Sequence, residues 1–169
     1  ALTTEQAANM GTLQVAALTT ASIVALETED LAALSTKAIA AMTTKQISVL
    51  TTDDGQIASL RTDQVASLTT AQVAALTTAQ IAVIETEDLV ELNSAQIKAL
   101  TTAQITSLTT DEGQIAALTT DQINSLTSAQ VAKLSASQVV ALTTEQFAEM
   151  GTLQVAAISS AAISSLETE

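Results

Sequence analysis

Residues 2–166 repeat an eight-residue pattern, L-T-T-x-Q-[I/V]-A-x, of which residues 68–76 (LTTAQVAAL) are a clear copy. Twenty units of this kind fill the chain. A repeat this short cannot bury its apolar face alone, so it must pack against neighbouring repeats. The repeat therefore indicates an array of stacked units, and it restricts the fold more than any other feature of the sequence.

The positions of each unit are numbered from its first threonine, so that Thr69 is position 1, Gln72 position 4, Val73 position 5 and Leu76 position 8. Position 8 is Leu, Met or Ile in every unit. Position 5 is aliphatic in all units except the two that carry Ala7 and Phe147. Positions 5 and 8 are therefore the two core anchors of each unit.

Neither a long helix nor a strand can bury both anchors on one face. Eight helical residues at about 100° each advance about 800°, so the apolar stripe would rotate about 80° with every unit. In a strand, successive anchors lie three and then five residues apart, and both odd spacings place them on opposite faces. Both regular structures would leave much of the apolar surface in water.

A separate short helix in every unit accounts for the anchors and for the polar residues together. In residues 69–72 (TTAQ) the Thr69 hydroxyl can accept from the N–H of Gln72, whose side chain reaches back to the N–H of Thr69, which is a capping box. Leu68 and Val73 then hold the two positions of a hydrophobic staple. We expect an all-α fold, a solenoid or superhelical coil of very short capped helices of about six residues, one per eight-residue repeat. Helices this short are unstable alone and depend on stacking.

Two units, 51–60 (TTDDGQIASL) and 109–118 (TTDEGQIAAL), contain ten residues instead of eight. In each of them an aspartate, Asp53 or Asp111, stands three residues before the glutamine and forms a D-x-x-Q cap pattern. The pattern predicts that the helix survives and that the linker before it gains two residues. We also expect the coil to change course at these two units.

Segments longer than the eight-residue unit, or octad, are also repeated in the chain. Residues 27–84 and 85–142 are identical at 33 of 58 positions, and residues 1–29 recur as 141–169 with 21 identities. We interpret residues 1–169 as a single continuous array. Because neither end carries a polar capping repeat, we expect it to be a fragment of a longer array.

The composition argues against several classes of function. The chain contains no His, Cys, Trp, Tyr or Pro, so it lacks the usual general base, thiol chemistry and soft-metal ligands, and we expect no enzymatic activity. Its net charge of −13 repels nucleic-acid backbones and anionic membrane surfaces. The longest uninterrupted apolar stretch, residues 38–42, is far too short to span a membrane.

Groups of acidic residues are the first candidate sites, because Ca²⁺ is bound by carboxylate and carbonyl oxygens. The alternative is that carboxylates in a first helical turn complement the helix dipole and stay hydrated. No EF-hand loop or glycine-rich calcium repeat is present, so we favour the hydrated interpretation and assign no metal-binding residues. The four groups are Glu27/Glu29/Asp30, Asp53/Asp54, Glu85/Glu87/Asp88 and Asp111/Glu112.

The threonine pairs are the second candidate, since regularly spaced hydroxyls could form a flat array that matches ice or another ordered surface. The alternative is that the first threonine of each pair is a helix N-cap, already bonded to its own backbone. Charged residues at position 3, such as Lys37, Lys45 and Asp63, would interrupt a flat face. We favour the capping interpretation and name no catalytic or cofactor-binding residues and no cofactor.

The phrase L-T-T-x-Q-[I/V]-x-x-L, as in residues 76–84 and 100–108, resembles tandem-repeat regions of very large bacterial secreted or cell-surface proteins, including adhesin-like and RTX-type proteins. The resemblance covers the whole chain. It implies export, further copies in the parent protein and a role as a stalk or surface scaffold.

These observations predict a structural tandem-repeat scaffold or spacer in a larger, extracellular bacterial protein, with neighbouring repeats of the same chain as its partners. The alternative is a binding module, assisted by calcium, whose variable positions 3, 6 and 7 recognise a protein or surface ligand. A spacer would scatter the variable residues around the coil. A binding module would gather them on one concave face.

Overall fold

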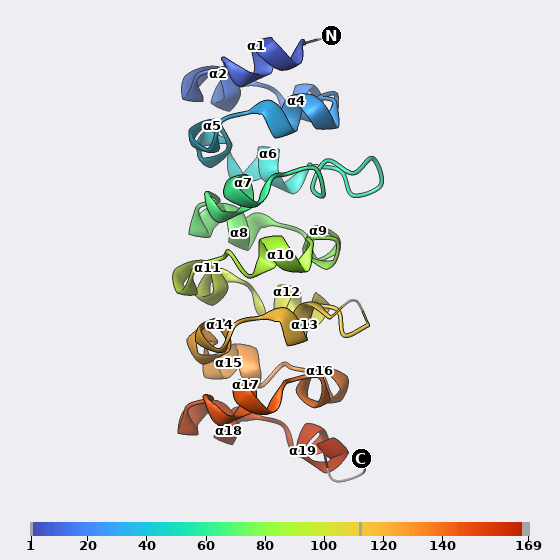
Figure 1. Cartoon of the computed structure of the whole chain (residues 1–169), viewed down its shortest axis with the longest axis vertical. Coiled ribbons are helices and arrows are strands. Elements are labelled where there is room, and N and C mark those ends of the chain that lie inside the picture. Colours follow the sequence, from blue (N-terminus) through green and yellow to red (C-terminus); the bar gives the residue numbers. More distant parts are fainter. Residues whose placement is uncertain (1, 112, 167–169) are drawn as a thin grey trace.

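Short helices make up most of the computed structural model, which describes residues 2–111 and 113–166 (Figure 1). These residues form nineteen helices of four to seven residues and contain no strand, which confirms the predicted all-α fold of short helices. The helices are α1 (Thr4–Ala8), α2 (Thr12–Ala17), α3 (Thr20–Val24), α4 (Thr28–Ala33), α5 (Thr36–Ala41), α6 (Thr44–Ser48), α7 (Thr62–Ala66), α8 (Thr70–Ala75), α9 (Thr78–Ala82), α10 (Thr86–Leu89), α11 (Ser94–Ala99), α12 (Thr102–Ser107), α13 (Gln114–Ala117), α14 (Thr120–Ser125), α15 (Ser128–Val131), α16 (Ala136–Val140), α17 (Thr144–Ala148), α18 (Thr152–Ala157) and α19 (Ser160–Leu166).

Each helix stops because positions 8 and 1 leave the helical conformation. Around α8, Leu76 has φ −57° and ψ 141°, and Thr69 has φ −71° and ψ 157°. The Thr69 hydroxyl accepts from the N–H of Gln72 at 3.2 Å, and the Thr69 N–H donates to Gln72 Oε1 at 2.7 Å. The predicted frame of the capping box is therefore confirmed.

The core is a continuous column of aliphatic side chains that runs from one end of the array to the other. Position 5 supplies fully buried residues such as Val73 and Ile81, and position 8 supplies Leu76 and Ile84. Leu68, the predicted staple residue before the N-cap Thr69, is buried as well. In the middle of the array two anchors from each unit thus fill the interior, as the repeat pattern predicts.

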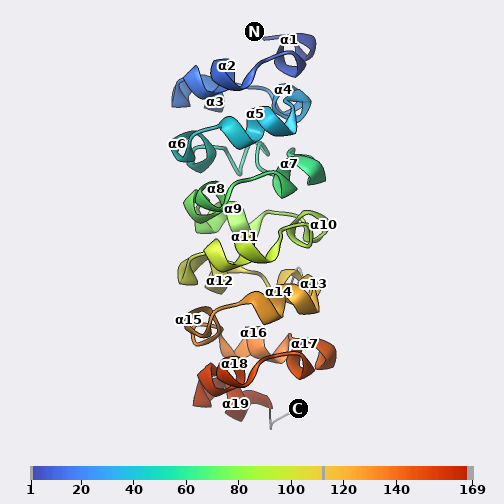
Figure 2. The same cartoon turned by 90° about the vertical axis from the view of Figure 1, so that its left-hand side faces the viewer.

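Helices that lie three units apart in sequence pack on each other, as α8 does on α11 and α9 does on α12. Hydrogen bonds described below join units that lie four apart. The chain therefore winds with between three and four units in each turn. Figures 1 and 2 show the result from two sides, an elongated column with α1 at one end and α19 at the other.

The two ten-residue units differ from the expectation in where the extra residues lie. Asp53 does not cap Gln56; the Gly55 N–H donates to the Thr52 carbonyl at 3.1 Å, and Gly55 takes a left-handed φ of 74°. The Ile57 N–H reaches the Thr51 carbonyl at 3.1 Å, as position 5 bonds to position 1 in a regular octad. The two extra residues therefore loop out inside the first turn instead of lengthening the linker before it.

The same loop occurs in 109–118, where Gly113 has φ 77° and is the N-cap of α13. The prediction that a helix survives is correct here but wrong for 51–60, where the chain forms turns without an α-helix. The two loops are seven units apart, which corresponds to about two turns of the column. They therefore protrude on the same side (Figure 1), and the column continues past both without the expected change of course.

Candidate functional site

The glutamine at position 4 is the polar residue that the fold buries most consistently. Gln64, Gln72 and Gln80 are each at most 2% exposed, although positions 1 and 2 of the same units lie at the surface. A buried primary amide has one acceptor oxygen and two N–H donors to satisfy. The capping box uses only the oxygen.

The amide nitrogen of each of these glutamines bonds to the preceding turn of the column. Gln72 Nε2 donates to the carbonyls of Ile39 and Met42, both at 2.8 Å. Gln80 Nε2 donates in the same way to carbonyls at positions 5 and 8 of the unit four earlier. One side chain thus caps its own helix and ties that helix to another part of the chain.

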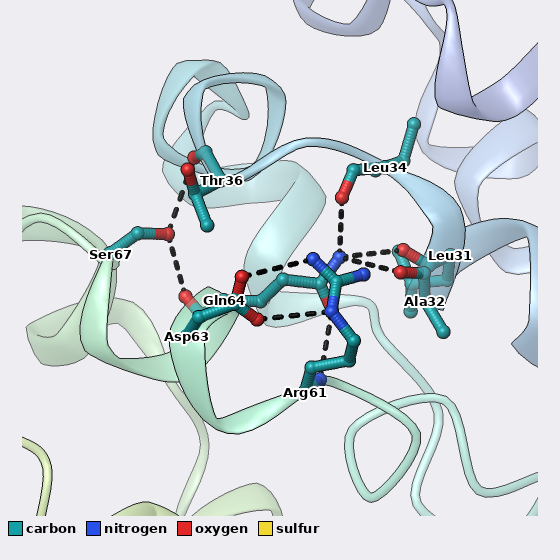
Figure 3. Close-up of polar contacts among 8 residues, drawn as sticks. All are labelled: Leu31, Ala32, Leu34, Thr36, Arg61, Asp63, Gln64 and Ser67. Carbon is teal, nitrogen blue, oxygen red and sulfur yellow. Dashed lines mark hydrogen bonds and ion pairs between the residues drawn. The ribbon is translucent and has the colours of Figure 1, made fainter.

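Figure 3 shows this arrangement around Gln64. Its Nε2 donates to the carbonyls of Leu31 at 3.1 Å, Ala32 at 3.2 Å and Leu34 at 2.7 Å. Its Oε1 accepts from the N–H of Arg61 at 2.8 Å. The Arg61 side chain makes no cap bond and pairs with Asp63 instead, so the N-cap N–H is satisfied by Gln64.

We use the term glutamine clamp for a position-4 glutamine whose Oε1 accepts from its N-cap N–H while its Nε2 donates to carbonyls of the preceding turn. In the described residues thirteen glutamines form this clamp: Gln46, Gln56, Gln64, Gln72, Gln80, Gln96, Gln104, Gln114, Gln122, Gln130, Gln138, Gln146 and Gln154. Each such bond contributes about 0.5–1.5 kcal/mol net, and an unmade one would leave a buried group unsatisfied at a cost of about 1–3 kcal/mol. The clamp is the recurrent polar contact between turns.

Sequence reasoning identified the capping box but missed the second half of the clamp. A capping box accepts Glu as readily as Gln. Position 4 nevertheless holds Gln in fifteen units and Glu in none. That preference for an amide was the available signal that the N–H₂ group has a partner.

Five units lack a glutamine at position 4. Among them, the unit with Asp88 shows how the turns pack when no amide is present. Asp88 is only 6% exposed, and its carboxylate makes no hydrogen bond within the described part of the chain. Without an amide it cannot donate to the preceding turn, where the equivalent carbonyls belong to Ile57 and Leu60. The stacking continues here through apolar contacts and the packing of α10 on α7.

The acidic groups considered for calcium do not converge. Across residues 2–111 and 113–166, no three His, Cys, Asp or Glu side chains form a group that could hold a metal ion. Glu27, Glu29, Asp53 and Asp54 lie at the surface, whereas Asp30 and Asp88 are buried. Glu112 lies outside the described residues.

The threonine pairs are used as helix caps. The hydroxyls of Thr43, Thr77 and Thr101 accept from the N–H of the glutamine in the same unit at 3.1–3.2 Å. The capping hydroxyls are therefore engaged with their own backbone, which favours the capping interpretation over an ordered hydroxyl surface.

The ten-residue units contain an unpaired hydroxyl instead. The Oγ1 atoms of Thr51 and Thr109 are buried and have no hydrogen-bond partner. Each borders an open hollow between its loop and the next turn, of about 260 Å³ and about 350 Å³ respectively. These hollows are the same feature repeated at the two insertions.

Comparisons with known proteins agree with the repeat geometry. No helix among the described residues has the length and apolar character needed to cross a membrane. No curated protein and no solved structure matches the chain. The model of the ALTTAQ repeat matches residues 23–54, 54–83, 81–112 and 115–152, each match spanning several eight-residue units. Because these matches cover well over half of its residues, the chain belongs to the ALTTAQ repeat family.

Proposed function

We propose that the chain is a segment of an α-solenoid that serves as a structural scaffold or spacer in a larger, extracellular bacterial protein. The observation that carries the proposal is the glutamine clamp, which recurs from Gln46 to Gln154. Each clamp joins one turn to the next by the same contacts. Such a column gains length with every added unit and needs no other partner to hold its shape.

The distribution of one variable position, position 3, supports a spacer over a binding module. Position 3 is exposed in every regular octad of the described chain. With between three and four units in each turn, these residues point outward in all directions around the column. They do not gather on the concave face that a binding module would present.

The charge and the chemistry of the surface fit the same role. A net charge of −13 keeps such columns hydrated and apart from each other. The proposal includes no enzymatic activity, because the sequence contains neither His nor Cys. The resemblance to bacterial secreted and cell-surface repeats motivates the extracellular location.

The location is tested with antibodies raised against the repeat and applied to cells of the source organism. Labelling of intact cells, or recovery of the repeat from the medium, is the expected result. Labelling that requires permeabilised cells would contradict an extracellular spacer.

The spacer role is tested by inserting a second copy of residues 85–142 after Leu142. This insertion adds seven units, or about two turns, so each glutamine still faces the same carbonyl positions of the preceding turn. We expect the maximum dimension from small-angle scattering to grow by about a third, because length scales with the number of repeats. A flexible Gly/Ser insert of equal length is the control, since it adds no helical circular dichroism. An unchanged maximum dimension would refute the rod-like spacer.

A further inference from the structure

Asp88 and Gln146 occupy equivalent places in the column, 58 residues apart and each in the fourth unit after a ten-residue unit. Gln146 shows the complete clamp at this place. Its Nε2 donates to the carbonyls of Ile115, Ala116 and Leu118 at 3.3, 3.1 and 2.5 Å. Three carbonyl oxygens of the ten-residue unit therefore converge on one nitrogen atom, and a group of positive character lies between them.

The carbonyls that face Asp88 in the same register belong to Ile57, Ala58 and Leu60. Those of Ala58 and Leu60 accept no hydrogen bond among the described residues. Aspartate has no N–H group, and its side chain is one methylene, about 1.5 Å, shorter than that of glutamine. The carboxylate can therefore neither donate to these carbonyls nor fill the place of the amide.

The Asp88 carboxylate is itself left without a partner. It is 6% exposed and makes no hydrogen bond in the part of the chain that the structure describes. Arg61, which directly follows Leu60, pairs with Asp63 at 3.0 Å and not with Asp88. A carboxylate buried without a counter-charge is strongly destabilising. The fold thus places a negative charge and carbonyl oxygens around one point and supplies no positive group from the described chain.

We propose that this point binds a hard metal cation, sodium or calcium, coordinated by the Asp88 carboxylate and by the carbonyls of Ile57, Ala58 and Leu60. Carboxylate and carbonyl oxygens are the ligands that such cations prefer, at about 2.3–2.6 Å for calcium. The slight exposure of Asp88 gives water access to the remaining coordination positions. The cation takes the role of the glutamine amide and ties this unit to the preceding turn.

This site differs from the acidic groups considered above, because it combines one carboxylate with backbone oxygens instead of gathering several carboxylates. Glu85 and Glu87 of the same unit lie at the surface, where their charges favour a cation nearby. The inference concerns one joint between two turns. It therefore goes beyond the scaffold role and does not depend on it.

The first experiment compares the wild-type chain with Asp88→Gln, which completes the clamp and removes the charge. Melting is followed by circular dichroism in choline, sodium or calcium chloride at equal ionic strength, and the sodium and calcium arms distinguish the two cations. The wild-type melting temperature should rise by roughly 2–6 °C over its value in choline in at least one arm, because a ligand of the folded state stabilises it. Asp88→Gln should show no such rise. An equal rise in both proteins would indicate general charge screening and overturn the proposal, as would a wild-type chain that responds to neither cation.

A second experiment moves the site. Gln146→Asp, made in the Asp88→Gln chain, removes the amide from the carbonyls of Ile115, Ala116 and Leu118 and places a carboxylate before them. This double variant should melt below Asp88→Gln in choline chloride and regain part of the difference in the salt that stabilises the wild-type chain. A double variant that folds but does not respond to that cation would reject the assignment of the site to a position-4 carboxylate and its facing carbonyls.

Discussion

A regular octad and a ten-residue unit reach the same stacking by different local structures. In 69–76 the chain forms α8, and the Thr69 hydroxyl caps it by accepting from the N–H of Gln72. In 51–60 the chain forms only turns, and the buried Thr51 hydroxyl has no partner. The second unit therefore lacks both the helix and the hydroxyl cap of a regular octad.

The contact with the preceding turn is nevertheless the same in both. Gln56 Nε2 donates to the carbonyls of Ile23 and Leu26 at 2.9 and 2.8 Å, as Gln72 Nε2 does to its own pair of carbonyls at 2.8 Å. The helix is therefore one way of presenting the glutamine, and a loop that returns through Gly55 is another. The clamp and the apolar anchors, rather than the helix, define the repeating contact.

The largest effect should come from Gln72→Glu. Glutamate still accepts from the Thr69 N–H, but its carboxylate would face two carbonyl oxygens in a buried site with no donor between them. We expect the free energy of unfolding to fall by about 3–5 kcal/mol, as for other uncompensated buried charges. Urea denaturation monitored by circular dichroism measures this free energy. Gln14→Glu makes the same chemical change at an exposed position and should cost less than about 0.5 kcal/mol.

Replacing the clamp glutamine by alanine in both kinds of unit tests whether the clamp stabilises the stacking independently of the helix. Gln72→Ala and Gln56→Ala each leave an N–H and two carbonyls without the amide, and we expect each to cost about 2–4 kcal/mol. If stacking relied on the capped helix, the loss would be clearly smaller for Gln56→Ala. Unfolding free energies from the same urea experiment decide between the two outcomes.

Gly55→Ala should destabilise the loop alone. A side chain at Gly55 meets no atom within 4 Å, but φ of 74° is unfavourable for an L-residue by about 1–2 kcal/mol. Gly11→Ala is the control, because Gly11 has an ordinary φ of −77° and meets only its own glutamine side chain at 3.4 Å. A fall in melting temperature for both variants would show that strain at positive φ is not the cause.

Replacing the position-1 threonine by valine should have the smallest effects on stability, and the effects should have opposite signs in a regular octad and in a ten-residue unit. Thr77→Val removes a hydroxyl that accepts from the Gln80 N–H at 3.1 Å, and we expect a loss of about 1 kcal/mol. Thr51→Val removes a buried hydroxyl that has no partner, so stability should stay equal or rise by up to about 1 kcal/mol. Comparable losses in the two variants would mean that the Thr51 hydroxyl has a partner in solution.

The sequence predicted the local structure well because the interactions that set it span only a few residues. The capping box joins Thr69 to Gln72, three residues away, and the anchors at positions 5 and 8 follow from the same eight-residue frame. The ten-residue units were predicted less well. The D-x-x-Q pattern at Asp53 fits a cap, but Gly55 allows a tighter return that keeps Thr51 in the position-1 role.

The sequence by itself therefore determined the frame of the repeat, the short capped helices and the aliphatic anchors, all of which depend on contacts within one unit. Only the tertiary structure decided how many units make a turn and where the glutamine amides bond. Their carbonyl partners lie 28 to 33 residues away, as for Gln104 with Leu76 and Gln72 with Ile39. Which carbonyls come within reach depends on the winding of the whole chain, and no single octad contains that information.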